Sequence, residues 1–311
     1  MTEQSNTSGQ RWQVALSWLV LILFVAGVEY WIGWKSVLEP WLAFSWAQGL
    51  IALALLVLSY ALRAWRMYDY FPQFLTGRWL QTWRLMLIHN ALNNLLPART
   101  GEISFPVLMK RYFNVAYAHS VSALLWFRAL DLHAILTFAV FPLLIATRLR
   151  VIAWPLLLVW MLLPILVYVL RNRIEISLAG KDGKFSEVMQ QALYGLPDSW
   201  GAFWRSWAMT WANWLVKLVT LAWLLGQFVP DASGNLLLTS VVTGELTSVL
   251  PIHAPGGFGT YEAGVLAPLS RIIEVKQAAM GAVNLHLFVL GSSLVGAVIG
   301  WMIPLKDRQN V

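Results

Sequence analysis

Long apolar runs separated by short polar segments form the dominant pattern of the chain. Six of them can be followed, over residues 12–34, 41–62, 120–145, 151–170, 203–228 and 281–304. A helix of about 20 residues crosses the roughly 30 Å hydrocarbon core of a bilayer, so each run is long enough to span a membrane. Because no small-residue cleavage site follows the first run, we expect that run to be retained as a helix. The pattern predicts an all-α polytopic membrane protein.

A further apolar region, residues 85–109, is interrupted in its middle by Leu96-Pro97 and Gly101. Its two arms, of about 12 and 7 residues, give helices of roughly 18 and 10 Å, which are too short to span. Arg84 precedes the region and Lys110 follows it. Basic flanks mark the cytoplasmic side, so both ends are expected on the same side of the membrane. We therefore predict a re-entrant helical hairpin, which must be buried in protein or line a wet cavity.

A second broken region, residues 236–266, has the same plan. An apolar run ends at Leu250-Pro251, a glycine-rich turn follows, and Glu262 opens the next apolar run, as Glu102 does in the first region. Proline, glycine and carboxylates are costly within hydrocarbon unless protein or water surrounds them. The second region is therefore also predicted to be a re-entrant hairpin, and we expect the two hairpins to meet and form a binding site.

The composition agrees with this fold class, and the distribution of charge orients it. Hydrophobic residues make up 59% of the chain and charged residues 12%, a balance that a soluble domain does not have. Thirteen Lys and Arg lie in segments predicted to be cytoplasmic, 63–84 among them, and five lie in the outer segments. This bias predicts two cytoplasmic termini and explains the formal charge of +7 without a nucleic-acid partner.

With that orientation, the first hairpin enters from the cytoplasm and the second from the outer face. About six full transmembrane helices and two opposed re-entrant hairpins form an inverted-repeat plan, which is frequent in transporters. We expect a single integral membrane domain over residues 1–311. Its first half-repeat would cover residues 1–155 and its second residues 156–311.

Charged side chains inside the predicted spans are the first candidates for a binding site. Arg128 and Asp131 lie three residues apart, on one face of a helix, where an unpaired charge is costly. They form either a structural ion pair or a clamp in which Arg128 holds a lipid phosphate and Asp131 is its counter-ion when the site is empty. Lys217 lies near the middle of its span in a polar stripe with Asn213, which we expect to line a polar interior.

The two hairpins supply the other candidates. Glu102 and Glu262 either cap the helices that they open or contact a cationic headgroup or carry a proton. Glu245 lies within a helical arm and has no capping role. The Gly256-Gly257 turn leaves backbone amides accessible to an anionic phosphate. The predicted substrate-binding residues are therefore Arg99, Glu102, Arg128, Asp131, Asn213, Lys217, Glu245, Gly256, Gly257, Tyr261 and Glu262.

Sequence signals of catalysis are missing. The chain has no cysteine, so thiol chemistry and cysteine-ligated metals are excluded. Its histidines are isolated, and it contains no HExxH, G-x-S-x-G, Walker or Rossmann motif. We expect no enzyme activity, no cofactor, no metal site and no ATP hydrolysis in this chain.

Three short motifs, in this order, resemble a known family. They are Asn94…Leu96-Pro97-Ala98-Arg99-Thr100-Gly101-Glu102, Arg128-Ala-Leu-Asp131 and Leu250-Pro251…Pro255-Gly256-Gly257-Phe258-Gly259-Thr260-Tyr261-Glu262. They are similar to the flippase-like membrane domain of the lysylphosphatidylglycerol synthases, the N-terminal half of the bacterial multiple peptide resistance factor, which also occurs in stand-alone form. The resemblance extends from about residue 10 to 305 and implies a bacterial inner-membrane protein that moves lipids between leaflets. Because the sequence ends at residue 311 without a soluble aminoacyl-transfer domain, we do not expect this chain to synthesise lysyl lipid.

The sequence thus predicts an ATP-independent flippase for a phosphate-bearing lipid. The lipid would be an amino- or sugar-modified phospholipid or a polyprenyl-phosphate-linked molecule. Membrane lipids are the expected partners, and a second copy of the chain and a separately encoded lipid-modifying enzyme are further candidates. Two alternatives stay open. The same plan would suit a small-solute or ion secondary transporter, and a glutamate could act as general base in a membrane-embedded enzyme for lipid phosphates.

Overall fold

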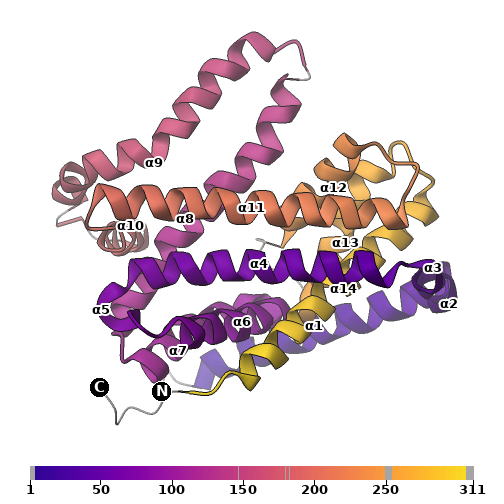
Figure 1. Ribbon diagram of the computed structural model, residues 1–311, viewed down its shortest axis with the longest axis horizontal. Helices are drawn as coiled ribbons and strands as arrows, with labels where there is room; N and C mark the ends of the chain where they lie inside the picture. Colours follow the sequence, from indigo (N-terminus) through magenta and orange to yellow (C-terminus); the bar gives the residue numbers. More distant parts are fainter. Residues whose placement is uncertain (1–3, 146, 179, 182, 249–253, 306–311) are drawn as a thin grey trace. The chain divides into compact units, whose positions relative to one another are not determined.

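The structure, a computed structural model, describes residues 4–145, 147–178, 180–181, 183–248 and 254–305. In these ranges helices are the regular secondary structure (Figure 1). Five helices are long and apolar enough to cross a membrane: α4 (Trp46–Tyr70), α8 (Tyr117–Ile145), α9 (Arg150–Leu178), α11 (Trp200–Phe228) and α14 (Val275–Met302). They confirm the all-α multi-pass fold and correspond to five of the six predicted spans.

The sixth predicted span corresponds to α1 (Gln4–Trp31), and this helix does not stand alone. Residues Trp18–Trp31 meet the length and hydropathy of a span together with Trp34–Ala43, across an 89° bend. The segment after the bend contains α2 (Trp34–Leu38) and α3 (Pro40–Ala43). Gly33 lies at the bend with a φ of 85°, a conformation that glycine adopts without steric cost. The bent pair is either a broken span or a re-entrant loop.

Helix α4 corrects the boundary that was predicted for the second span. The charges at Arg63 and Arg66 indicated that the span ends near residue 62, yet α4 continues to Tyr70. The start of the predicted cytoplasmic segment 63–84 is therefore part of a transmembrane-length helix. Only the short α5 (Pro72–Leu75) separates it from the following helix.

Both apolar regions that were predicted to be broken are broken. The first consists of α6 (Trp79–Leu95), the 3-10 helix η1 (Pro97–Ile103) and α7 (Ser104–Phe113). The second consists of α12 (Gly234–Thr247), the 3-10 turn η2 (Pro255–Gly257) and α13 (Thr260–Leu269). Leu250-Pro251 and His253 lie outside the described residues. Entry from opposite faces and the inverted repeat stay predictions.

Contacts divide the chain into two compact units, each assembled from both ends of the sequence. Unit 1 contains Met1–Tyr60, Met86–Ser104 and Leu215–Ile303, and unit 2 contains Ala61–Leu85, Phe105–Trp214 and Pro304–Val311. Helices α4, α6 and α11 therefore contribute residues to both units. The predicted half-repeats over 1–155 and 156–311 stay a prediction.

In unit 1, α12 and α13 form a closely packed helical hairpin beside α14, as the orange and yellow ribbons of Figure 1 show. Two glycines allow the close approach. A Cβ on Gly264 would lie 2.8 Å from the carbonyl oxygen of Thr243 and 2.9 Å from the Cα of Gly244. The hydroxyl of Thr243 also donates to the carbonyl oxygen of Gly264 at 2.7 Å. The absence of side chains at these two positions therefore sets the distance between the arms.

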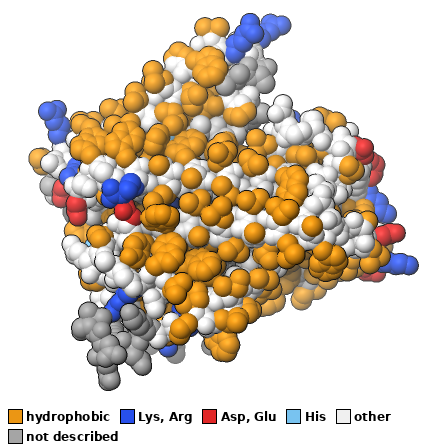
Figure 2. Space-filling view, viewed as in Figure 1, with side chains coloured by type: hydrophobic (Ala, Val, Ile, Leu, Met, Phe, Trp, Pro, Cys, Tyr) orange, Lys and Arg blue, Asp and Glu red, His pale blue; other side chains and the backbone are white. Residues whose placement is uncertain are grey.

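In unit 2, α8 packs against α9 and against α10 (Lys184–Tyr194). Helix α9 is poorly covered by protein, since only 17% of its apolar window is buried, against 56% for α14. Hydrophobic side chains occupy much of the face shown in Figure 2, and charged side chains are sparse among them. A surface of this kind is stable in hydrocarbon rather than in water, which agrees with a multi-pass membrane protein.

Candidate functional site

The two helix breaks of unit 1 meet. The 3-10 segments η1 and η2 lie against each other, and both lie against α1. The ring of Phe24 on α1 is 5.4 Å from the ring of Phe258, which directly follows η2. The side-chain amide of Asn94, near the end of α6, donates to the hydroxyl of Ser293 on α14 at 2.7 Å. Non-helical backbone from two distant parts of the chain is thus gathered in one place.

The first break turns back onto α6. A Cβ on Gly101 would lie 2.4 Å from the Cα of Asn93, so glycine lets η1 touch the last turns of α6. The imidazole of His89 is hydrogen-bonded to the hydroxyl of Ser104 at 2.8 Å. Glu102 is half-buried within η1. The backbone of Arg99 lies in η1, and its side chain is outside the described part of the structure.

Glu262 has two partners, and one of them confirms the helix-capping role that the sequence left open. Its Oε2 accepts a hydrogen bond from the backbone amide of Gly259 at 2.8 Å and so caps α13. Its Oε1 lies 2.7 Å from Nδ1 of His286 on α14, and both side chains are buried. The carboxylate is therefore a helix cap and also one half of a buried polar pair.

His286 was not among the predicted residues. It is a single histidine within an apolar transmembrane run, and that alone could have identified it. Its ring stacks on Tyr261, with ring centroids 4.5 Å apart. A Cβ added to Gly257 would lie 3.7 Å from the same imidazole, which places the glycine turn next to the Glu262–His286 pair. Gly256 and Gly257 have φ values of 73° and 77°, which only glycine adopts readily.

Lys217 of α11 and Glu245 of α12 are brought together by unit 1. Lys217 Nζ lies 2.6 Å from Glu245 Oε2, with side chains that are 13% and 5% exposed. Tyr261 packs near Gly244, one residue from Glu245. Its hydroxyl is buried and has no hydrogen-bond partner among the described residues. A buried hydroxyl without a partner is rare, because its desolvation is not compensated, so this group is available to a polar ligand.

A second charged cluster lies in unit 2, where Asp131 has the predicted partner Arg128 and also a closer one, Arg66. Arg66 Nη1 donates to Asp131 Oδ1 at 2.9 Å and to the hydroxyl of Thr210 at 2.6 Å. The indole of Trp214 donates to the same carboxylate at 3.2 Å. Arg128 lies farther away, 3.6 Å from Asp131 Oδ2. Arg66 is therefore the closer counter-ion, and Arg128 is the second.

The two arginines differ in exposure. The side chain of Arg66 is 6% exposed and that of Arg128 is 28% exposed. Asn213, which is buried, accepts a hydrogen bond from Arg63 Nε at 3.2 Å. Arg63 and Arg66 were missed as site residues because their charges were taken as the end of a span. Of the predicted site residues, Lys217, Glu245, Gly256, Gly257, Tyr261 and Glu262 thus lie in unit 1, and Arg128, Asp131 and Asn213 lie in unit 2.

The described residues contain no group of three or more His, Asp and Glu side chains that could hold a metal ion. The chemistry available in unit 1 includes the ammonium of Lys217, the carboxylates of Glu102, Glu245 and Glu262, the imidazoles of His89 and His286, and the phenol of Tyr261. Unit 2 adds three guanidinium groups around one carboxylate. Such groups can bind and release a phosphate, an amine or a hydroxyl through charge-assisted hydrogen bonds.

Comparison with known protein families identifies a family that covers most of the chain. Residues 12–296 match the family model described as the lysylphosphatidylglycerol synthase TM region, which is nearly the whole chain. Searches of curated proteins and of solved structures found no match.

Proposed function

The chain belongs to the lysylphosphatidylglycerol synthase TM region family, and we propose that it moves a phosphate-bearing lipid between membrane leaflets without ATP. The family links the chain to lipid modification or translocation. The substrate is an amino- or sugar-modified phospholipid or a polyprenyl-phosphate-linked molecule. The protein acts in the bacterial inner membrane, with both termini in the cytoplasm.

The observation that carries this proposal is the group of buried polar side chains where the two helix breaks meet. Lys217–Glu245 and Glu262–His286 are buried pairs on helices that are mostly apolar, and the hydroxyl of Tyr261 has no hydrogen-bond partner among the described residues. Charges within a bilayer are expensive and are usually retained for a substrate or ion pathway. Helix ends at such a break also present backbone N–H groups that suit a phosphate.

A headgroup can exchange with these internal pairs one interaction at a time. Lys217 binds the phosphate as it separates from Glu245, and Glu245 is then available to an amine or a sugar hydroxyl. Each partner keeps a counter-charge during the exchange, which avoids the cost of an isolated buried ion. The acyl chains stay in hydrocarbon throughout, so only the headgroup needs a polar route.

In this proposal Arg128 is a phosphate ligand of its own, within the cluster of unit 2. Its partner Asp131 keeps the shorter bond to Arg66 when Arg128 turns away. The movement therefore leaves no unpaired carboxylate, whereas movement of Arg66 would. A guanidinium that is partly exposed and shares its carboxylate with a closer arginine is suited to bind a phosphate reversibly.

Leaflet exchange of a fluorescent phospholipid in proteoliposomes tests the proposal. The wild type should expose the inner-leaflet label to a membrane-impermeant quencher, and Arg128→Ala should lose this activity while it still elutes as a folded protein. Arg205→Ala is the matched control, because Arg205 pairs with Asp69 and is 54% exposed. Exchange at the wild-type rate by Arg128→Ala would refute its role as a phosphate ligand. A wild type that moves a soluble solute but no lipid would support the secondary-transporter alternative.

A double variant with exchanged charges tests whether the Lys217–Glu245 pair serves transport or only the packing of unit 1. The double variant Lys217→Glu with Glu245→Lys keeps an ion pair but exchanges the positions of its charges. We expect a folded protein with strongly reduced exchange, because the phosphate then meets a carboxylate. Undiminished exchange by the folded double variant would mean that the pair serves only packing.

A further inference from the structure

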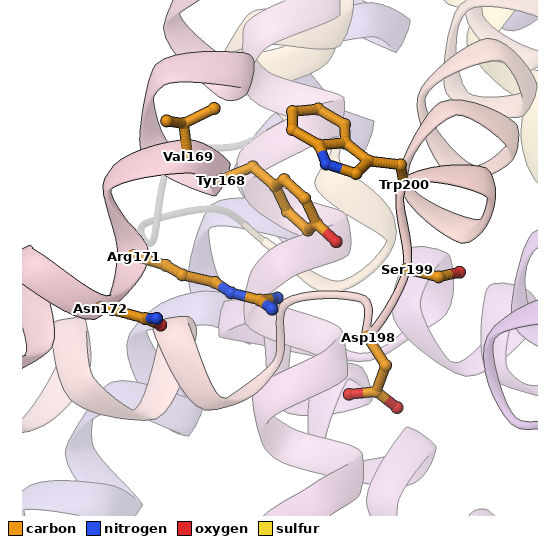
Figure 3. Close-up of a pocket in the computed structure, with 7 residues that line it drawn as sticks. All are labelled: Tyr168, Val169, Arg171, Asn172, Asp198, Ser199 and Trp200. Carbon is orange, nitrogen blue, oxygen red and sulfur yellow. The ribbon is translucent and has the colours of Figure 1, made fainter.

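Unit 2 contains a pocket of about 530 Å³ between the end of α9 and the start of α11. It is distinct from both charged clusters described above, and none of its residues was predicted to bind substrate. Figure 3 shows Tyr168 and Arg171 extending from α9 toward the loop that carries Asp198. The pocket is lined by Tyr168, Val169, Arg171, Asn172, Asp198, Ser199 and Trp200.

One part of the pocket is suited to an anion. Arg171 Nη1 donates to the carbonyl oxygen of Pro197 at 3.0 Å, and the guanidinium lies 4.8 Å above the ring of Tyr168. These two contacts hold the side chain in place, and the guanidinium has further N–H donors. The hydroxyl of Ser199 accepts from the amide of Ala202 at 3.2 Å, so α11 begins at the pocket wall. A fixed guanidinium beside a helix N-terminus favours a phosphate.

Another part of the same pocket is suited to a cation. Asp198 is exposed and lines the pocket with Arg171. None of the ion pairs among the described residues joins these two side chains, although both residues line one cavity. A carboxylate repels a phosphate and attracts an ammonium group. The pocket therefore presents one charge of each sign, which matches a headgroup that carries a phosphate and an amine.

The surface next to the pocket indicates that this headgroup belongs to a lipid. Val169 lines the pocket and is 58% exposed. Leu166, Leu162 and Val159 follow at helical spacings of three and four residues, so they extend one face of α9 from the pocket, and all three are exposed. This apolar stripe is roughly 15 Å long at 1.5 Å per residue, enough to cover much of an acyl chain. A soluble phosphate compound has no acyl chain that could lie along this apolar stripe.

We propose that this pocket is a binding site for a zwitterionic phospholipid with a primary amine, such as phosphatidylethanolamine. Arg171 holds the phosphate, Asp198 holds the ammonium group, and an acyl chain lies along the stripe of Val159, Leu162, Leu166 and Val169. Tyr168 and Trp200 pack edge to face, with ring centroids 4.5 Å apart, and form the wall at the level of the headgroup. Aromatic rings of this kind are common at the membrane interface. The site does not depend on the proposed translocation.

Native mass spectrometry of the full chain, with phosphatidylethanolamine or phosphatidylglycerol added in equal amounts, tests the site. The wild type should retain phosphatidylethanolamine in preference. Arg171→Gln should weaken binding of both lipids, and Asp198→Asn should weaken phosphatidylethanolamine alone, each by about tenfold or more, since a charged hydrogen bond contributes roughly 1.5–3 kcal/mol. Arg173→Gln, an exposed neighbour that does not line the pocket, is the matched control and should bind as the wild type.

Two further measurements keep the result interpretable. Arg171→Lys retains the charge without the planar fork, so it should fold normally and bind with intermediate affinity. Free phosphoethanolamine should bind far more weakly than the lipid. Unchanged affinity in Arg171→Gln and Asp198→Asn, or equal binding of free phosphoethanolamine, would overturn the proposal. Binding is read here without transport, so failure of leaflet exchange in the wild type would refute the proposed function and leave this site standing.

Discussion

Removal of the charge of Asp131 should be among the most destabilising single changes in unit 2. The carboxylate of Asp131 is buried and accepts hydrogen bonds from Arg66 at 2.9 Å and from Trp214 at 3.2 Å. In Asp131→Asn the shape of the side chain is retained, but the guanidinium of Arg66 stays buried without a counter-charge. The variant therefore isolates the electrostatic part of the interaction.

The expected magnitude follows from the geometry. Two unit charges about 4 Å apart interact by about 4 kcal/mol at an effective dielectric constant of about 20. Removal of one partner from a buried ion pair typically costs about 3–5 kcal/mol, because the other charge is left uncompensated. Arg128→Gln removes the 3.6 Å contact of a side chain that is 28% exposed. Its cost should stay below about 1 kcal/mol, as for pairs that are accessible to solvent.

Unfolding by sodium dodecyl sulfate in mixed micelles, followed by circular dichroism, would measure both variants at one detergent composition. The expected order of stability is wild type, then Arg128→Gln slightly below it, then Asp131→Asn far below. Arg66→Met combined with Asp131→Asn should recover part of the loss, since no buried charge then lacks its partner. If Asp131→Asn unfolds within about 1 kcal/mol of the wild type, or if Arg128→Gln costs as much, Arg66 is not the dominant partner of Asp131.

Two further predictions concern packing and helix capping. Gly264→Ala should destabilise the protein by about 1–3 kcal/mol in the same titration, because the new Cβ meets backbone atoms of α12 that cannot move aside. Ala263→Leu, a change at an exposed position, is the control. Equal stability of Gly264→Ala and the wild type would contradict the close approach of α12 and α13. Glu274 accepts the amides of Lys276 and Gln277 at 3.0 and 2.8 Å, and these hydrogen bonds hold the pKa of Glu274 below its usual range. A lowered carboxyl pKa stabilises the folded state above the ordinary pKa and loses that effect as pH falls through the lowered value, so Glu274→Ala should have a lower melting temperature than the wild type at pH 7 and a smaller difference at pH 3. A difference that stays constant between these pH values would show that the charge of Glu274 does not contribute.

The spans and the two breaks could be read from the sequence because they depend on local properties. A bilayer requires apolar runs of a given length, and such runs predict α8 and α11 closely, whereas α9 continues eight residues beyond its predicted end and α14 begins six residues before its predicted start. A proline in an apolar run removes a backbone donor and ends a helix, which is why Leu96-Pro97 identified the break before η1. The cap at Glu262 is also local, since the carboxylate and the amide of Gly259 are three residues apart.

The extent of α4 could not be read in this way. Arg63 and Arg66 resemble the basic flank that ends a span, and nothing near them in sequence indicates otherwise. The structure places Asp131 and Thr210 beside Arg66, and Asn213 beside Arg63. These groups compensate the charges within the helix, so the helix continues to Tyr70.

By itself, the sequence determined an all-α membrane protein with broken apolar regions and a set of charged residues that require partners. The tertiary structure alone decided which partners they have, namely Lys217 with Glu245, Glu262 with His286, and Asp131 with Arg66 ahead of Arg128. The reason is physical. Helix formation and membrane insertion depend on neighbouring residues and on hydrocarbon thickness, whereas a buried charge is stabilised by whichever opposite charge the packing of distant helices brings within about 3–4 Å.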